Sequence, residues 1–153
     1  MRVRNSQDTL EIEFILERCD ACYLAMVDTQ GMPYVLPFNF GFAGGVIYLH
    51  SGKTGRKMDI LRQNPNVCIN FSTDHRLYMR HKEVACSAGM DFRSVLAFGK
   101  VEFITDYDAK IEALNIIMRK YTSRDFPYNP PAVHNVEVYK VVPTQINAKI
   151  SGY

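Results

Sequence analysis

The sequence predicts an α+β domain whose antiparallel sheet closes into a barrel. About six segments of strand length are joined mostly by short turns, and helical patterns stand between some of them rather than after every strand. A chain of 153 residues is most simply one domain, residues 1–153, and it is long enough to bury one substantial core. Because a small barrel has a filled interior, a large ligand is expected on its outside or at a subunit boundary.

A helix and then a three-stranded meander are expected in the first third of the chain. Asp8 and Glu11 have the spacing of a capping box, and apolar residues follow at helical spacing, which predicts a helix over residues 9–19. Pro37 lies inside the second strand and cannot donate to a ladder, so that strand should bulge or lie at a sheet edge. The three strands are expected over 21–28, over 33–42 and in the segment that ends at His50.

The rest of the chain adds two helices and further strands. Residues from Gly55 to about Gln63 suit a short helix, which Asn64-Pro65 ends because proline disfavours helix in the residue before it. A longer helix begins after residues 105–108, and its apolar stripe should face the core. Strands are predicted over 67–72, 83–88, 94–104 and 136–142, with a connection at 89–93 and a stiff proline-rich link at 127–131.

Composition is that of an ordinary globular protein. Apolar residues make up 47% and charged residues 22%, and the net charge is only +2, so nucleic-acid binding, which usually needs a basic face, is not favoured. The N-terminal residues lack the apolar run of a signal peptide, and no stretch of about 18 uncharged apolar residues occurs. We therefore expect a cytoplasmic protein without a membrane segment.

Neither the cysteines nor the histidines predict a metal site. Cys19 and Cys22 form a C-x-x-C pair, but no second pair has matching spacing, and a thioredoxin-type motif should follow a strand rather than precede one. We expect reduced, partly buried cysteines. His75 and His81 with Cys86 match no established zinc spacing.

The most informative local feature is a basic loop between the strand that ends at His50 and the helix after it. Its glycines, Gly52 and Gly55, let the backbone approach an anion. The first turn of the helix offers unpaired N–H groups, and Arg56 and Lys57 add positive charge there. The loop is therefore a candidate phosphate site. The alternative is a solvated charge cluster, although cations are mildly unfavourable at a helix start unless an anion compensates them.

Two familiar phosphate motifs do not fit this loop. A Walker A loop needs a glycine five residues before the Gly52-Lys53-Thr54 triplet, but Ile47 occupies that position inside the preceding strand. No G-x-G-x-x-G follows a predicted strand either. Neither a nucleoside triphosphate nor a dinucleotide bound in the Rossmann manner is favoured.

A longer pattern of residues extends this interpretation. It runs from Leu24-Ala25 through Gly31, Pro33-Tyr34-Val35, Pro37, Phe40, His50-Ser51 and Gly55-Arg56-Lys57 to Asn64-Pro65, and resumes at 92–99. In this order the chain resembles the flavin-binding split-barrel proteins related to pyridoxamine 5′-phosphate oxidase, and among them the 5-nitroimidazole-resistance branch. The resemblance implies an α+β fold with a six-stranded antiparallel split β-barrel and flanking helices.

The resemblance also implies a flavin site. In similar proteins the residues that match Gly55, Arg56 and Lys57 hold the flavin phosphate. The cofactor is expected to be FMN, although FAD could occupy the same position because a solvent-facing phosphate can carry an adenylate extension. Other matching residues run beside the isoalloxazine ring or line the flavin on the adjoining strand, and these are Pro37, Phe38, Asn39, His50 and Ser51.

Proteins of this kind form homodimers with two flavins at the interface. The resemblance therefore implies that residues matching Phe92, Ser94 and Val95 approach the flavin from the second subunit.

A flavin-dependent oxidoreductase that reduces a small aromatic or nitroaromatic compound is the leading functional hypothesis. The flavin would carry the electrons. His50 is the one side chain proposed as a proton donor or substrate contact, and a histidine hydrogen-bonded at a strand end is the alternative. Vitamin B6 oxidation is not favoured, because residues 34–39 and 141–153 lack the arginine-containing motifs of true pyridoxamine phosphate oxidases. A flavin- or haem-binding protein without turnover, with His50 or His81 as an axial ligand, is the competing hypothesis.

Overall fold

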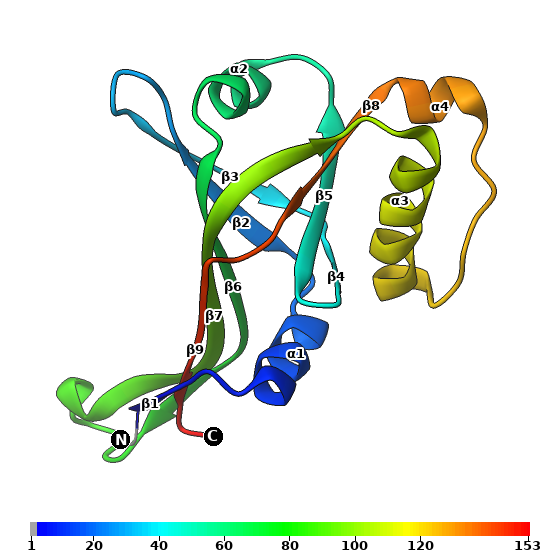
Figure 1. Ribbon diagram of the computed structural model, residues 1–153. Helices are drawn as coiled ribbons and strands as arrows, with labels where there is room; N and C mark the ends of the chain where they lie inside the picture. Colours follow the sequence, from blue (N-terminus) through cyan, green and yellow to red (C-terminus); the bar gives the residue numbers. More distant parts are fainter. Residues whose placement is uncertain (1–2) are drawn as a thin grey trace.

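The computed structural model describes residues 3–153 and is an α+β fold (Figure 1). Within these residues nine strands form one antiparallel sheet in the order β3-β2-β6-β7-β8-β5-β4, with β9 paired to β7 and β1 paired to β9. The strands are β1 (Val3–Ser6), β2 (Cys22–Val27), β3 (Pro33–Phe38), β4 (Gly41–Ala43), β5 (Val46–Gly52), β6 (Asn66–Met79), β7 (Ala88–Ile104), β8 (Val136–Val141) and β9 (Gln145–Ser151). The helices are α1 (Thr9–Arg18), α2 (Arg56–Gln63), α3 (Tyr107–Thr122) and α4 (Pro130–His134), with a 3₁₀ turn at Ala85–Ser87.

Strand β7 joins the two halves of the sheet. Its residues 92–98 pair with β9 and its residues 101–104 pair with β8, while its other edge pairs with β6 as far as residue 100. The sheet curls around a core of alternating inward side chains, and α1 adds Ile12, Ile15 and Leu16 to that core. A smaller cluster around Leu114 and Val138 lies beneath α3.

Several predictions about the fold are confirmed. The class is α+β with an antiparallel sheet, and the first, second and third helices begin and end within a few residues of the expected bounds. Asp8 caps α1 by accepting a hydrogen bond from the backbone N–H of Glu11 at 2.9 Å. Strand β3, which contains Pro37, lies at the edge of the sheet and pairs only with β2, as a proline inside a strand requires.

Other predictions are corrected. Six strands were expected, and β1 and β9 were not among them because their many polar residues have weak strand propensity. The strand predicted over 83–88 is wrong, and so is the connection at 89–93, which belongs to β7. Val84 and Met90 of these segments are both more than two-fifths exposed. The link at 127–131 is only partly extended, because Pro130 and Pro131 open α4.

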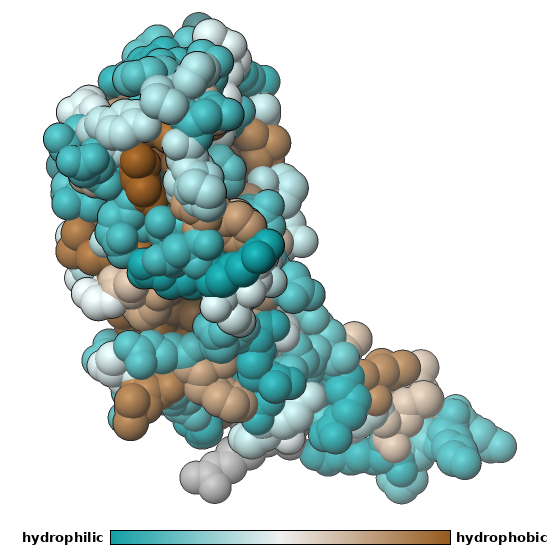
Figure 2. Space-filling view, turned by 90° about the vertical axis from the view of Figure 1, so that its right-hand side faces the viewer, coloured by the Kyte–Doolittle hydropathy of each residue, from teal (hydrophilic) through white to brown (hydrophobic). Residues whose placement is uncertain are grey.

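Strands β6 and β7 continue past the barrel as a hairpin that projects from the body, at the lower left of Figure 1 and the lower right of Figure 2. The register shifts between Thr73 and Arg76, where Asp74 adopts a left-handed backbone conformation with φ 56°. Both described chain ends lie beside the base of this hairpin.

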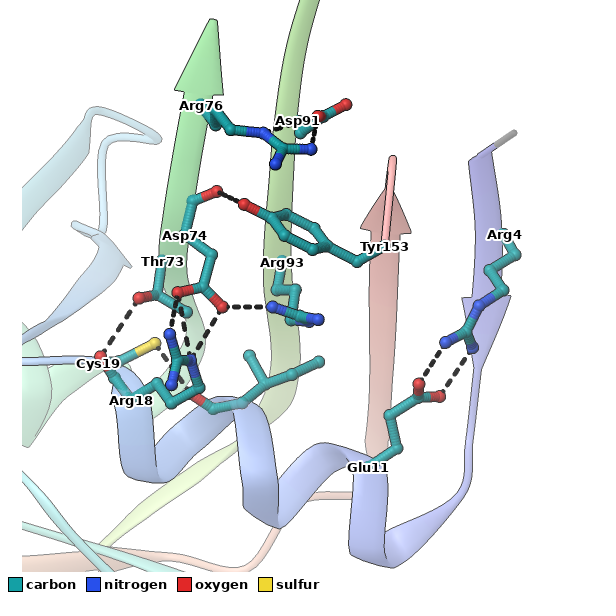
Figure 3. A network of polar contacts seen from close by, with 11 residues as sticks. Arg4, Glu11, Arg18, Cys19, Thr73, Asp74, Arg76, Asp91, Arg93 and Tyr153 are labelled. Atoms are coloured by element: carbon teal, nitrogen blue, oxygen red, sulfur yellow. Dashed lines mark hydrogen bonds and ion pairs between the residues drawn. The ribbon is translucent and has the colours of Figure 1, made fainter. Parts of the chain in front are cut away.

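Asp74, at the base of the hairpin, forms hydrogen bonds with α1, β7 and the C-terminal residue (Figure 3). Its carboxylate accepts hydrogen bonds from Arg18 of α1 and from Arg93 of β7, each at 2.5 Å, and its backbone carbonyl accepts one from the hydroxyl of Tyr153 at 2.8 Å. Arg18 first and Arg93 second lower the pKa of Asp74 to about 2. The network therefore ties the first helix, the hairpin and the C-terminus together.

Helices α3 and α4 cover the β4–β5 side of the sheet. Gly41 permits the close approach of α3, because a Cβ there would lie 2.8 Å from the backbone nitrogen of Ile117. The expected apolar stripe of α3 consists of Ile111, Leu114, Met118 and Tyr121, with Ile117 beside it; Leu114 and Ile117 are buried, and Ile111 and Met118 are partly buried. Tyr121 of that stripe is 39% exposed, but its hydroxyl donates to the carbonyl of Asp20 and accepts from the backbone N–H of Phe40. Across residues 3–153, no helix combines the length and the apolar character needed to cross a membrane.

Candidate functional site

The loop after β5 opens α2 without a side-chain cap. Gly55 is the N-cap residue and has φ 103°, a conformation that favours glycine, and no side chain accepts a hydrogen bond from the first turn. A Cβ added to Gly52 or Gly55 would meet no atom within 4 Å, so the loop backbone faces open space. The first N–H groups of α2 are therefore open to an anion, as the sequence predicted.

The two basic residues of this helix start lie in different environments. Arg56 is exposed, and its guanidinium carbon lies 4.7 Å from the ring centroid of Tyr34 and its Nη2 atom 3.8 Å from a carboxylate oxygen of Asp28. Lys57 is half-buried and lines an adjacent cleft. Sequence reasoning missed Tyr34 and Asp28 as neighbours of the candidate phosphate site. The pairing of β3 with β2 and the packing of α2 against β2 bring them to the helix start.

An open cleft of about 430 Å³ lies between β3, β5 and the start of α2. Six of the residues predicted to contact a flavin line it together, although they come from three separate segments of the chain. Leu36 and Gly52 complete the lining and were not predicted as contacts, since Leu36 resembles an ordinary strand residue. The six predicted residues are Pro37, Phe38, Asn39, His50, Ser51 and Lys57.

His50 occupies the wall of this cleft on β5. Its Nδ1 atom is buried and has no hydrogen-bond partner within the described chain, and burial lowers the pKa of its imidazole. The neutral imidazole is therefore favoured near neutral pH. Next to it, the Ser51 hydroxyl donates to the carbonyl of Gly52 at 3.1 Å. The alternative was a histidine that is hydrogen-bonded at a strand end. Within residues 3–153, Nδ1 of His50 makes no such hydrogen bond.

The three residues expected from a second subunit lie elsewhere. Phe92, Ser94 and Val95 are on β7 between β6 and β9, and none of them lines the cleft of their own chain. Val95 is fully buried in the core, so only its backbone could approach a ligand. The Ser94 hydroxyl donates to the carbonyl of Lys149 at 3.3 Å. A role for these residues in a partner's site stays a prediction.

The described residues hold no cluster for a metal ion, and the C-x-x-C thiols are not activated. Among residues 3–153 no three His, Cys, Asp or Glu side chains converge to hold a metal ion. All four cysteines are free, as expected, and burial raises the pKa of Cys19 to about 11 and of Cys22 to about 12. Neither thiol of the C-x-x-C pair is therefore a ready nucleophile.

The family model described as pyridoxamine 5′-phosphate oxidase matches residues 8–150. The chain therefore belongs to the pyridoxamine 5′-phosphate oxidase family, as the sequence pattern predicted. No curated protein matches the chain at a significant level.

Solved structures place the chain within this family more narrowly. It is similar to a candidate 5-nitroimidazole antibiotic resistance protein from Bacteroides thetaiotaomicron, with 44% identity and a TM-score of 0.87 over 97% of this chain and 87% of that one. The flavocytochrome Anf3 from Azotobacter vinelandii has 22% identity and a TM-score of 0.82, covering 97% and 70% of the two chains. An FAD and heme binding protein from Mycobacterium smegmatis has 17% identity and a TM-score of 0.84, covering 97% and 74%. The last two show the shared fold.

Proposed function

We propose that this protein binds a flavin, FMN or FAD, in the cleft between β3, β5 and α2, and uses it to reduce a small aromatic or nitroaromatic compound. The observation that carries the proposal is the convergence of an uncapped helix start with six cleft-lining residues from three segments. The relative at 44% identity, which is named for 5-nitroimidazole resistance, supports the nitroaromatic class. The flavin- and heme-binding relatives support the type of cofactor within this fold.

The residues present fit a flavin. A phosphate at the start of α2 would accept hydrogen bonds from the open backbone N–H groups and would lie near Lys57. The exposed side chain of Arg56 could move from the ring of Tyr34 to reach the phosphate. The volume of the cleft suits a ring system that stays partly open to solvent. His50 lines the same cleft, so its imidazole would contact the ring or a substrate.

The protein's contribution to the chemistry is positioning and proton supply. A bound flavin, once reduced by an external donor such as a reduced nicotinamide, supplies the electrons. Pro37 and Phe38 would give the ring an apolar wall and restrict the access of water. His50 would orient the substrate or exchange a proton with it, since an imidazole of lowered pKa is neutral at pH 7 and can pass protons either way.

A second copy of the chain is part of the proposal. The outward side chains of neighbouring strands fall into register as Val35, Ala25, Cys68 and Phe98 in one row and Pro37, Tyr23, Asn70 and Leu96 in the next. Val35 is 57% exposed and Phe98 38%, so an apolar sheet face lies open beside the cleft. We propose that this face packs against its own copy in a homodimer and so brings the partner's β7 toward the flavin.

The test is the absorbance spectrum of the purified protein, followed by anaerobic titration with reduced nicotinamide and then with a nitroaromatic compound. A yellow protein whose flavin bleaches with the nicotinamide and recovers its colour with the nitroaromatic compound is expected. Mass spectrometry of the released cofactor separates FMN from FAD. A Soret band after addition of haem, without nicotinamide-dependent bleaching, would instead favour a binding protein without turnover. A colourless protein that takes up no added flavin would contradict both forms of the proposal.

A further inference from the structure

A second cavity of about 210 Å³ lies on the other side of His50, beneath α3 and α4. Figure 2 views the face of the molecule that carries these two helices, and hydrophobic atoms appear there among hydrophilic ones. Most of the lining is aliphatic and includes Leu114, Ile117 and Val136. The remaining positions include His50 and Tyr128, and none of the lining residues carries an Asp, Glu, Lys or Arg side chain.

Two residues that line this cavity carry buried polar atoms without a hydrogen-bond partner in the part of the chain that the structure describes. His50 Nδ1 and the Tyr128 hydroxyl are buried and have no hydrogen-bond partner within the described chain. Among residues 3–153 only three side-chain nitrogen or oxygen atoms are buried without a hydrogen-bond partner. Two of the three belong to residues that line this cavity. Buried polar groups almost always have partners, so the pair indicates a bound molecule that supplies them.

His50 connects this cavity with the cleft described above. The same imidazole lines both, so a molecule in the cavity would be separated from the flavin position by little more than one side chain. Within the described chain no other residue lines both. The remaining cavity residues come from α3, the segment before α4, α4 and β8, while those of the cleft come from β3 and the residue after it, the end of β5 and the start of α2.

The cavity's size and polarity define the class of ligand. An engineered apolar cavity of about 150 Å³ accepts benzene, so 210 Å³ suits a single aromatic ring with one or two small substituents. An ionic ligand would find no opposite charge in the lining, which favours a neutral molecule. The Tyr128 hydroxyl stays protonated because burial raises its pKa, so it offers a hydrogen-bond donor.

We propose that this cavity binds a neutral, single-ring aromatic ligand whose polar substituent accepts a hydrogen bond from Tyr128 and whose ring lies against His50. This binding site is independent of the flavin, because the imidazole of His50 separates the cavity from the cleft. The sequence pattern did not identify Tyr128 as a site residue, because it lies in the proline-rich segment between Pro127 and Asn129.

The test measures binding of 2-methyl-5-nitroimidazole by calorimetry and by amide chemical shifts, in protein with flavin and in protein stripped of it. Tyr128→Phe removes a hydroxyl that has no partner in the chain, so the variant should keep its thermal midpoint. Its affinity for the probe should fall by roughly 3- to 15-fold. Ala132→Phe, at an exposed position of the lining, should fill the cavity and abolish binding. Tyr107→Phe is the matched control, because Tyr107 packs on His134 and does not line the cavity.

The outcomes separate this inference from the flavin proposal. Probe binding that depends on Tyr128 in flavin-free protein supports the site, even if the protein retains no flavin and the proposed function fails. Flavin retention together with equal probe affinity in the wild type, Tyr128→Phe and Ala132→Phe would overturn the site and leave the flavin proposal standing. Absence of probe binding in both forms of the protein, as expected if the cavity holds only water, would also overturn it.

Discussion

The guanidinium of Arg56 lies over the ring of Tyr34, 4.7 Å from its centroid, and its Nη2 atom lies 3.8 Å from a carboxylate oxygen of Asp28. Arg56 is therefore held by β3 and by the turn that follows β2 rather than by the helix start to which it belongs. A phosphate at α2 would compete with these two contacts, so the neighbours of Arg56 should tune the affinity for flavin.

Asp28→Asn should tighten flavin binding. The asparagine keeps an oxygen for the backbone N–H groups of Gln30 and Met32, which hydrogen-bond to Asp28 Oδ1 at 2.9 Å, but it no longer attracts Arg56. Because exposed ion pairs are weak, the dissociation constant should fall by about two- to fivefold, as measured by fluorescence quenching of added flavin. In an Arg56→Ala background the same substitution should change nothing. An equal effect in both backgrounds would show that Asp28 acts without Arg56.

Replacing Arg56 and Lys57 together by Ala should weaken flavin binding strongly while the fold stays intact. Each charge-assisted contact with a phosphate contributes about 1.5–3 kcal/mol, so the combined loss of affinity should be at least about 100-fold. Flavin occupancy after purification and the circular dichroism spectrum are the two measurements. Arg80→Ala with Lys82→Ala removes the same charge from the far end of the hairpin and serves as the control. Unchanged occupancy in the Arg56 and Lys57 double variant would remove the basis of the phosphate site.

Phe98→Glu should separate the proposed homodimer. Phe98 lies in the apolar row formed by β3, β2, β6 and β7, and a carboxylate there would be buried without a partner at the interface. Light scattering should report the monomeric mass, and flavin retention should drop with it. Leu10→Glu places the same charge at an apolar position of α1 that is 75% exposed, and it should leave the mass unchanged. A wild-type protein that is already monomeric would exclude the interface.

The folded protein should lose stability through His50 as the pH falls below roughly 6.5. Burial lowers the pKa of this imidazole in the folded state, so below its ordinary pKa the unfolded chain binds more protons than the folded chain and the free energy of unfolding decreases as the pH falls. Asp74 and Glu11 stay ionised in this range, because their pKa values are about 2. Urea unfolding of flavin-free protein at several pH values measures the effect. His50→Gln should flatten the slope in this window, whereas His81→Gln, at an exposed position, should not.

Asp74→Asn should loosen the hairpin. Asparagine keeps one oxygen acceptor but loses the negative charge that pairs with Arg18 and Arg93, which should lower the free energy of unfolding by about 1.5–3 kcal/mol. The folded-state pKa of Asp74 lies below its unfolded value, so its contribution is complete above roughly pH 4 and is lost as the pH falls toward 2. Hydrogen exchange of β6 and β7 amides is the local measurement. Asp125→Asn, which breaks an exposed pair with Arg119, should have no measurable effect.

Local chemistry was sufficient to predict the uncapped, basic helix start at Gly55. A glycine at the N-cap, two cations in the first helical turn and a strand just before them all lie within about ten residues, so no distant contact is needed to form them. The prediction that residues 37–39 contact a flavin came instead from resemblance, and the structure places these residues in the same cleft as His50 and Lys57.

Local sequence patterns are enough to predict the α+β class, three of the helices, the edge position of the strand that contains Pro37 and the open helix start at Gly55. Each of these depends on spacing or on backbone conformation within a few residues. The three-dimensional packing was needed to find that Arg56 contacts Tyr34 and Asp28, that 83–93 belongs to a projecting hairpin, and that His50 and Tyr128 line one cavity. These features join residues far apart in the chain, and strand order and helix packing, which no local pattern encodes, bring them together.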